Sequence, residues 1–284
     1  MPRLDFRIVN VFTQGRAALT GNPLCVFVFE SAESLDAATM QALARQFNLS
    51  ETTFILPSSK ANARVRIFTP SFELPFAGHP TLGTAHVCRA LGLGADELKL
   101  EMQAGVIPVR ARGDRWTLQA VDPTWRECEV PRARLASALG LTERDIADRP
   151  LWVKAGTEQL IVPLASEQAV RSIKIDAATL STIVNDAGRS MAHVFAELPD
   201  RNKLLARFFF QSAGSFAEDP ATGSATANLG GWMIATGRAL PCSFELSQGE
   251  YAGRPSTLFL DVDASRGIYV SGEVIELGRG TLQL

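Results

Sequence analysis

The chain has 284 residues and a mass of 30.7 kDa, with 46% hydrophobic residues, 20% charged residues and a net charge of −2. Such a chain buries a sizeable core without needing disulfides or a structural metal. A near-neutral charge without Lys or Arg clusters argues against binding to nucleic acid or anionic lipid, and no apolar run approaches the ~20 residues of a membrane-spanning helix. The first residues lack the apolar core of a signal peptide, so we expect a cytoplasmic protein without nucleic-acid or membrane partners.

Most apolar segments are short, rich in β-branched or aromatic residues, and bounded by Gly, Pro or Asn, which predicts strands. Helical periodicity is clear in four other segments. Many strands with few helices and no regular β-α-β alternation favour an α+β fold. In chain order, the predicted elements are strands 6–11 and 25–29, helix 35–47, strands 53–56 and 65–68, helix 81–91, strands 98–102, 116–120 and 160–163, helix 177–185, strands 193–197 and 207–210, helix 224–236, and strands 244–246, 258–262 and 268–275.

Two segments about half the chain apart resemble each other. His79-Pro-Thr-Leu-Gly-Thr-Ala85 aligns with Asp219-Pro-Ala-Thr-Gly-Ser-Ala225. Upstream, Arg66-Ile-Phe-Thr-Pro-Ser71 echoes Arg207-Phe-Phe-Phe-Gln-Ser212 at almost the same spacing, and a third echo follows downstream. Echoes in the same order at so long a period predict two similar units, each with a strand, a loop, a helix and further strands.

Both copies of this repeat place Pro, Gly and a small hydroxyl residue where a helix is expected to begin. Pro suits the first helical turn and Asp is a good N-cap, so two well-capped helices are one interpretation. The other interpretation is anion binding. Gly223 with Ser224, and Gly83 with Thr84, would leave free backbone N–H groups at a helix N-terminus. Two such ends could hold one carboxylate between the two domains.

Six blocks of distinctive sequence lie in order over nearly the whole chain: Gly21-Asn-Pro-Leu-Cys-Val-Phe27, Asn48-Leu-Ser-Glu-Thr-Thr-Phe54, Arg66-Ile-Phe-Thr-Pro70, Pro75-Phe-Ala-Gly-His-Pro-Thr-Leu-Gly-Thr-Ala85, Glu218-Asp-Pro-Ala-Thr-Gly-Ser-Ala225, and Gln248-Gly with Arg254-Pro-Ser256. Together these blocks resemble the PhzF (phenazine biosynthesis) family. The resemblance implies the diaminopimelate-epimerase-like fold, in which two pseudo-symmetric domains are each a β-barrel wrapped around a central helix.

The duplication and the resemblance together predict the domain boundaries. The N-terminal barrel domain is expected at residues 1–124, with residues 277–284 returning to it, and the C-terminal barrel domain at residues 125–276. Asp122-Pro-Thr-Trp-Arg-Glu127 is the expected connector. The resemblance further implies an active site in the cleft between the domains, and a homodimer.

Glu51 is the residue whose interpretation changes most with the resemblance. From the residues alone, Asn48-Leu-Ser-Glu51 fits a helix capping box or a polar strand edge. By resemblance, Glu51 matches the catalytic acid/base of the family. A carboxylate is suited to taking a proton from one carbon and returning it to another.

The resemblance also assigns the remaining site residues. His79 and Asp219 match residues that line the pocket and orient or protonate the substrate. From the residues alone, His79 fits a histidine in a turn and Asp219 fits a helix N-cap. Gly78 and Ser224 match backbone or hydroxyl contacts with substrate. Ser50 joins this substrate-binding set, as does Gly223 through its helix opening.

The cysteines and histidines form no motif that predicts a disulfide redox pair, a thiol-dependent epimerase or a metal site. Cys25, Cys88, Cys128 and Cys242 form no C-x-x-C pair and do not occupy repeat-related positions. Amino-acid epimerases of this fold use two thiols, one from each half, so two-thiol epimerisation is disfavoured and we expect reduced, packing cysteines. The three histidines form no metal motif and the glycines form no nucleotide fingerprint, so no metal and no cofactor is predicted.

These observations predict a cofactor-independent isomerase that moves a proton within a small carboxylate-bearing substrate, as the family enzyme does with dihydro-hydroxyanthranilate. Glu51 would abstract and redeliver the proton, while His79 and Asp219 fix the amino or hydroxyl groups. The helix start at Gly223 and Ser224 would hold the carboxylate. Two alternatives stay open: an amino-acid epimerase or racemase that uses Glu51 and Asp219, and a non-catalytic binding or regulatory protein on the same fold.

Overall fold

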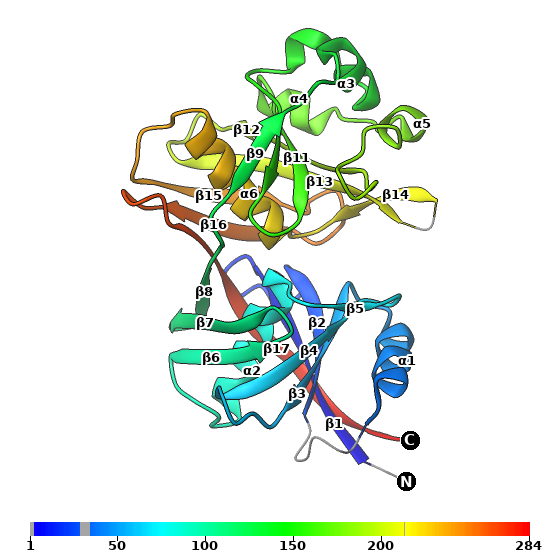
Figure 1. The fold of residues 1–284 in the computed structure, drawn as a ribbon, viewed down its shortest axis with the longest axis vertical. Helices are drawn as coiled ribbons and strands as arrows, with labels where there is room; N and C mark the ends of the chain where they lie inside the picture. The colour runs from blue at the N-terminus through cyan, green and yellow to red at the C-terminus, as the bar shows by residue number, and fades with distance from the viewer. Residues whose placement is uncertain (1–2, 29–34, 213) are drawn as a thin grey trace. The chain divides into compact units, whose positions relative to one another are not determined.

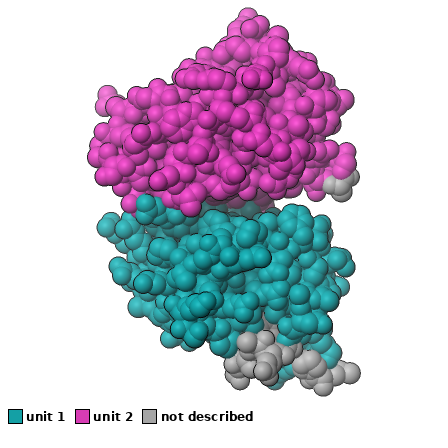
Figure 2. Space-filling view, in the orientation of Figure 1, with its two compact units in different colours: residues 1–119, 271–284 teal, residues 120–270 magenta. Residues whose placement is uncertain are grey.

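The computed structural model describes residues 3–28, 35–212 and 214–284. Its contacts divide the chain into two compact units (Figure 2): unit 1 holds residues 1–119 and 271–284, and unit 2 holds residues 120–270. Both boundaries fall a few residues before those expected from the sequence. Ala120 already belongs to unit 2, where its backbone N–H donates to the carbonyl oxygen of Ile268.

The elements of unit 1 are β1 (Arg3–Val11), β2 (Asn22–Val28), α1 (Ala37–Phe47), β3 (Glu51–Leu56), β4 (Ala63–Phe68), β5 (Glu73–Leu74), α2 (Gly78–Ala90), β6 (Glu97–Met102), β7 (Gly105–Arg112), β8 (Arg115–Gln119) and most of β17 (Ile268–Gln283) (Figure 1).

Eight of these strands close into a barrel. β2 pairs antiparallel with β1 and parallel with β3, and β4 pairs antiparallel with β3 and parallel with β6. β6, β7 and β8 follow as an antiparallel meander, and β17 completes the ring by pairing with both β8 and β1. Closure pairs every strand of the ring on both sides, which removes the exposed edges that an open sheet would present.

Helix α2 fills the interior of this barrel. Nine of its thirteen residues are buried, and it packs against β1, β2, β3, β4, β6 and β8. Gly83 permits the close approach, because a Cβ at this position would lie 2.6 Å from Cδ2 of Leu24 and 2.9 Å from Cγ2 of Val11. Helix α1 packs against β3 and β4, over an apolar cluster that includes Phe27 and Phe54.

The elements of unit 2 are β9 (Thr124–Glu127), α3 (Arg132–Ala138), the 3-10 helix η1 (Glu143–Asp145), β10 (Leu151–Lys154), β11 (Glu158–Pro163), α4 (Glu167–Arg171), α5 (Ala177–Leu180), β12 (Met191–Glu197), β13 (Lys203–Ser212), β14 (Ser215–Asp219), α6 (Gly223–Ala235), β15 (Cys242–Gln248) and β16 (Ser256–Val262).

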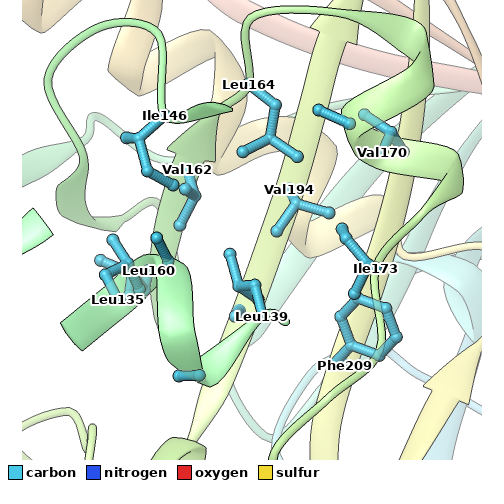
Figure 3. Close-up of a cluster of buried hydrophobic side chains, with 14 of the residues drawn as sticks. Leu135, Leu139, Ile146, Leu160, Val162, Leu164, Val170, Ile173, Val194 and Phe209 are labelled. Atoms are coloured by element: carbon cyan, nitrogen blue, oxygen red, sulfur yellow. The ribbon is translucent and has the colours of Figure 1, made fainter. Parts of the chain in front are cut away.

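Unit 2 repeats the strand pairing of unit 1. β10 and β11 are antiparallel, β11 and β12 parallel, β12 and β13 antiparallel, β13 and β15 parallel, and β15 and β16 antiparallel. Helix α6 takes the place of α2: ten of its thirteen residues are buried, and it packs against β9, β10, β11 and β16. A large apolar cluster that includes Leu139, Val162, Val194 and Phe209 packs α3 and α4 onto these strands (Figure 3). The predicted α+β architecture, with strands wrapped around a central helix in each half, is confirmed.

The hairpin before each central helix differs in length between the two units. In unit 1, the guanidinium group of Arg66 on β4 pairs with Glu73, seven residues later. In unit 2, Arg207 on β13 makes the same bidentate pair with Glu218, eleven residues later. The hairpin of β13 and β14 therefore contains four more residues than that of β4 and β5.

This extra length corrects the sequence alignment of the two halves. Helix α2 begins at Gly78 and helix α6 begins at Gly223, so these two glycines are the equivalent positions. His79 consequently corresponds to Ser224. The alignment of His79 with Asp219 was wrong, because it ignored the insertion in the second hairpin.

Several elements were not predicted from the sequence: β5, β7, β9, β10, β14, α3 and α4. In β7, only Val109 is buried, so the strand lacks a regular alternation of apolar and polar residues. The predicted helix 177–185 is wrong beyond its first turn, because α5 already ends at Leu180. The last residue of the predicted strand 25–29 lies outside the described residues.

Candidate active site

Glu51 and His79 meet inside unit 1. Glu51 is the first residue of β3 and His79 is the second residue of α2. His79 Nδ1 lies 2.9 Å from Glu51 Oε2, and the two side chains are 6% and 19% exposed, respectively. The structure thus brings together two of the three predicted catalytic residues, in a place where water has limited access to the carboxyl group.

The second ring nitrogen of His79 has a backbone partner. Nε2 lies 3.1 Å from the carbonyl oxygen of Asn22, the first residue of β2. Because a carbonyl oxygen can only accept, Nε2 carries a proton and donates it to Asn22. Sequence reasoning missed Asn22, since a backbone oxygen leaves no side-chain signal; only its place in the Gly21-Asn-Pro block pointed to it.

One further contact holds β3 against α2 next to this pair. Thr53 lies two residues after Glu51, so both side chains face the same side of β3. The hydroxyl oxygens of Thr53 and Thr84 are 2.8 Å apart and buried. This hydrogen bond fixes the distance between the strand that carries Glu51 and the helix that carries His79.

Gly78 and Ser50 flank the pair along the chain. Gly78 precedes His79 as the first residue of α2, and a Cβ there would meet only Cδ2 of Leu118, at 3.7 Å. Ser50 precedes Glu51 and is exposed. The capping-box interpretation is wrong, because Asn48 is the left-handed C-cap of α1 and Glu51 begins a strand.

Asp219 lies in unit 2, at the end of β14. Its carboxylate accepts a hydrogen bond from the hydroxyl group of Thr222. Gln248 Nε2 donates both to the backbone oxygen of Asp219, at 2.9 Å, and to Oγ1 of Thr222, at 3.0 Å. Asp219 is not a helix N-cap, since that position belongs to Thr222. Thr222 and Gln248, which hold this segment, were not assigned a role from the sequence.

Gly223 and Ser224 are the first two residues of α6. Gly223 is buried and Ser224 is partly exposed. The Ser224 hydroxyl oxygen accepts a hydrogen bond from Nε2 of Gln159 at 3.0 Å. The first backbone N–H groups of a helix have no partner within the helix and favour negative charge. The start of α6 therefore offers donors suited to an anionic group.

The corresponding expectation for Gly83 and Thr84 was wrong. Helix α2 starts at Gly78, so both residues lie in the interior of the helix and are buried. Their backbone N–H groups are consequently paired along the helix and offer nothing to a ligand. The sequence placed the helix start three residues too late, at Thr81, whereas the helix begins at Gly78 and Pro80 lies within its first turn.

The surroundings of the four cysteines indicate that their side chains take part in packing and do not act as bases. Cys25, Cys88, Cys128 and Cys242 are all free thiols. Burial raises the pKa of the Cys25 thiol far above its usual range and that of Cys88 to about 12. Burial also raises the pKa of Cys128 and Cys242. A thiol that stays protonated is a poor base, which disfavours two-thiol epimerisation.

Two further observations concern the part of the chain that the structure describes. It contains no group of three or more His, Cys, Asp or Glu side chains arranged to hold a metal ion. None of its helices has both the length and the apolar character needed to cross a membrane.

Comparison with known proteins places this geometry in a family. The PhzC-PhzF family, described as phenazine biosynthesis-like protein, matches residues 9–279. An uncharacterized isomerase of Pasteurella multocida is 38% identical over 282 residues, covering 98% of this chain and 93% of the relative. The trans-2,3-dihydro-3-hydroxyanthranilate isomerase of Pseudomonas chlororaphis is 35% identical over 295 residues, covering 98% of each chain.

A solved structure shows the same fold. The PhzF-family phenazine biosynthesis protein of Bacillus anthracis superimposes with a TM-score of 0.85 at 22% identity, and each chain is fully covered. The match extends over both units. Sequence and fold agree, and this chain belongs to the PhzC-PhzF (phenazine biosynthesis-like) family and is an isomerase of the PhzF type.

Proposed function

We propose that this isomerase moves a proton within a small, carboxylate-bearing substrate similar to trans-2,3-dihydro-3-hydroxyanthranilate, and that Glu51 is its acid/base. The observation that carries the proposal is the hydrogen bond between Glu51 and His79. The substrate class follows the relative from Pseudomonas chlororaphis, which carries that substrate in its name.

The contacts of His79 determine how many protons the pair holds. With Nε2 donating to Asn22, a neutral His79 presents the lone pair of Nδ1 to Glu51. That lone pair and a carboxylate oxygen repel each other, so a contact of 2.9 Å requires a proton between them. The proton resides either on Glu51 or on Nδ1. The pair can therefore release one proton to a substrate carbon and accept another in return.

An allylic proton shift needs no cofactor. The proton leaves one carbon, the double bond moves, and a proton returns to another carbon, so the substrate is neither oxidised nor reduced overall. A positioned acid/base pair is sufficient for such a step. Accordingly, we propose that Glu51 and His79 act without a bound cofactor.

The start of α6 is the proposed binding site for the substrate carboxylate. Its backbone N–H groups and the Ser224 hydroxyl group are donors, and Gly223 has no side chain to obstruct an approaching ligand. Asp219, an acceptor held in place by Thr222, is suited to an amino or hydroxyl group of the substrate.

The test is proton NMR in D₂O with trans-2,3-dihydro-3-hydroxyanthranilate and a panel of small unsaturated carboxylic acids. We expect the wild-type protein to incorporate deuterium at carbon and to move a double bond. Glu51→Gln should lose turnover by about 100-fold or more, because the amide can keep the hydrogen bond to His79 but cannot transfer the proton. Glu97→Gln, which changes an exposed carboxyl on β6, is the matched control.

Three results would contradict the proposal. Inversion of a stereocentre without movement of a double bond would identify an epimerase. A protein that binds these acids without exchanging any C–H bond would be a binding protein. Turnover by Glu51→Gln within a few-fold of wild type would remove Glu51 from the mechanism.

A further inference from the structure

Two buried amide side chains, those of Gln159 and Asn228, form a chain of hydrogen bonds that ends at Ser224, near the start of α6. Gln159 on β11 is 1% exposed and Asn228 on α6 is fully buried. Gln159 Nε2 lies 3.0 Å from Ser224 Oγ, and Asn228 Nδ2 lies 2.7 Å from Gln159 Oε1. Asn228 is anchored in turn by the backbone: Ala155 N lies 2.6 Å from its Oδ1, and its Nδ2 lies 2.9 Å from the carbonyl oxygen of Thr157.

The two backbone contacts set the direction of every hydrogen bond in this chain of groups. Ala155 N–H can only donate and the Thr157 carbonyl can only accept, so the amide orientation of Asn228 is fixed. Asn228 Nδ2 must then donate to Gln159 Oε1, which leaves Gln159 Nε2 to donate to Ser224 Oγ. Because the Ser224 oxygen is the acceptor in this bond, its own proton points away from Gln159.

The equivalent positions in unit 1 show that the fold does not require these amides. By strand register, Gln159 on β11 corresponds to Leu24 on β2. By helix position, Asn228 is the sixth residue of α6 and corresponds to Gly83, the sixth residue of α2. In unit 1, the methyl group of Leu24 fills the space that a Cβ at Gly83 would enter. Burying polar groups costs free energy that their hydrogen bonds only offset, so packing alone would favour the apolar pair.

We propose that Gln159 and Asn228 are positioning residues that present the Ser224 hydroxyl group as a hydrogen-bond donor to a carboxylate of the substrate. This inference rests on the proposed function, in which the start of α6 binds that carboxylate. The selectivity follows from the direction of the bonds. The bond from Gln159 occupies one of the two lone pairs of the Ser224 oxygen and turns its O–H away from Gln159. Donation to an anionic oxygen is then favoured over acceptance from an amide N–H.

The test is a double-mutant cycle on binding. Dissociation constants of anthranilate, benzoate and tartrate, and of the matching amides, are measured by NMR titration for wild type, Ser224→Ala, Gln159→Met and the double variant. Met has nearly the volume of Gln but donates no hydrogen bond. Leu160→Met, the next residue on β11, controls for a change in packing; it lies in the apolar cluster of unit 2. Unfolding curves confirm that each variant is folded.

We expect Ser224→Ala and Gln159→Met to weaken carboxylate binding by similar factors of about 10, with much smaller changes for the amides. The double variant should bind no more weakly than Ser224→Ala alone, because Gln159 acts only through the hydroxyl group. If Gln159→Met does not fold, Gln159→Glu keeps the contact with Asn228 but presents an acceptor to Ser224, and it should show the same selective loss.

The outcomes separate the two proposals. Additive effects of the two substitutions, equal losses for acids and amides, or full carboxylate affinity in Gln159→Met would overturn the positioning role while leaving the carboxylate site in place. Unchanged affinity in Ser224→Ala would remove Ser224 from that site, and the positioning role with it. A wild-type protein that binds no acid of the panel better than its amide would overturn both.

Discussion

The imidazole ring of His79 is held between Glu51 Oε2, 2.9 Å from Nδ1, and the backbone oxygen of Asn22, 3.1 Å from Nε2. The contact at one ring nitrogen determines which proton transfer is possible at the other. The backbone oxygen keeps the Nε2 proton in place, so any proton that moves in this pair moves between Nδ1 and Glu51. In the proposed mechanism, His79 is therefore the partner of Glu51 in proton transfer.

Replacing His79 tests this role directly. His79→Asn retains an amide that can donate to Glu51 but cannot hold a transferable proton, and we expect turnover to fall by about 100-fold while the protein stays folded. His86→Asn is the control, since His86 lies on the same helix and its Nδ1 contacts Trp116 Nε1 at 3.4 Å. Steady-state kinetics and an unfolding curve decide; turnover of His79→Asn close to wild type would contradict the assignment.

The cysteines should be dispensable for chemistry. We expect single Cys→Ala substitutions at the two fully buried thiols, Cys25 and Cys88, to lower the free energy of unfolding by roughly 1 kcal/mol, because a buried thiol behaves as a small hydrophobic group. Turnover should persist in both variants, and in those of Cys128 and Cys242. A variant that is well folded but inactive would restore the two-thiol interpretation.

Gly83 should be intolerant of a methyl group. A Cβ at this position would lie within 3 Å of side-chain atoms of Leu24 and Val11. Overpacking typically costs about 1–3 kcal/mol, and the better helix propensity of Ala returns about 1 kcal/mol. We therefore expect urea unfolding to show a net loss of up to about 2 kcal/mol for Gly83→Ala. Gly278→Ala on β17, where no atom lies within 4 Å of the added carbon, should change stability by less than about 0.5 kcal/mol.

His193 should make the protein sensitive to acid. Burial lowers the pKa of His193 from 6.5 to about 3 in the folded protein, and the backbone of Ala225 opposes this shift. Below pH 6.5 the unfolded chain binds a proton that the folded chain does not, so stability falls as pH falls from 6.5 toward 3.

The slope of this loss is measurable. One such group lowers the free energy of unfolding by up to about 1.4 kcal/mol per pH unit in that window. In His193→Leu, which keeps the site apolar, urea unfolding between pH 4 and pH 6.5 should show a shallower dependence on pH than in wild type. Equal slopes would show that His193 is not buried in its neutral form.

The sequence was sufficient for most strands because apolar residues alternate or cluster there, as in β1 and β13. It was insufficient for β7, whose side chains are largely exposed. It was also insufficient for the four extra residues of the second hairpin, since Arg207 and Glu218 pair across a turn whose length leaves no mark in the local pattern. That single insertion misplaced the equivalence between the two halves.

The candidate site could also be predicted only in part from the sequence. Glu51 and His79 were identified through ordered sequence blocks, and the structure shows that they touch. Asn22 contributes a backbone oxygen, which every residue has, so its role required coordinates. Gln159 carried no clear signal, because it follows Glu158 at the polar start of β11, and only its contacts with Ser224 and Asn228 indicate a role.

The strand β17 has a consequence for the order in which the protein is made. Residues 271–284 supply the strand that lies between β8 and β1, although those two strands belong to the first part of the chain. During synthesis, the barrel of unit 1 cannot close until these residues have left the ribosome. Unit 2 has no such requirement for a late segment beyond residue 270. The second unit to be translated is therefore the first whose full set of residues is available to fold.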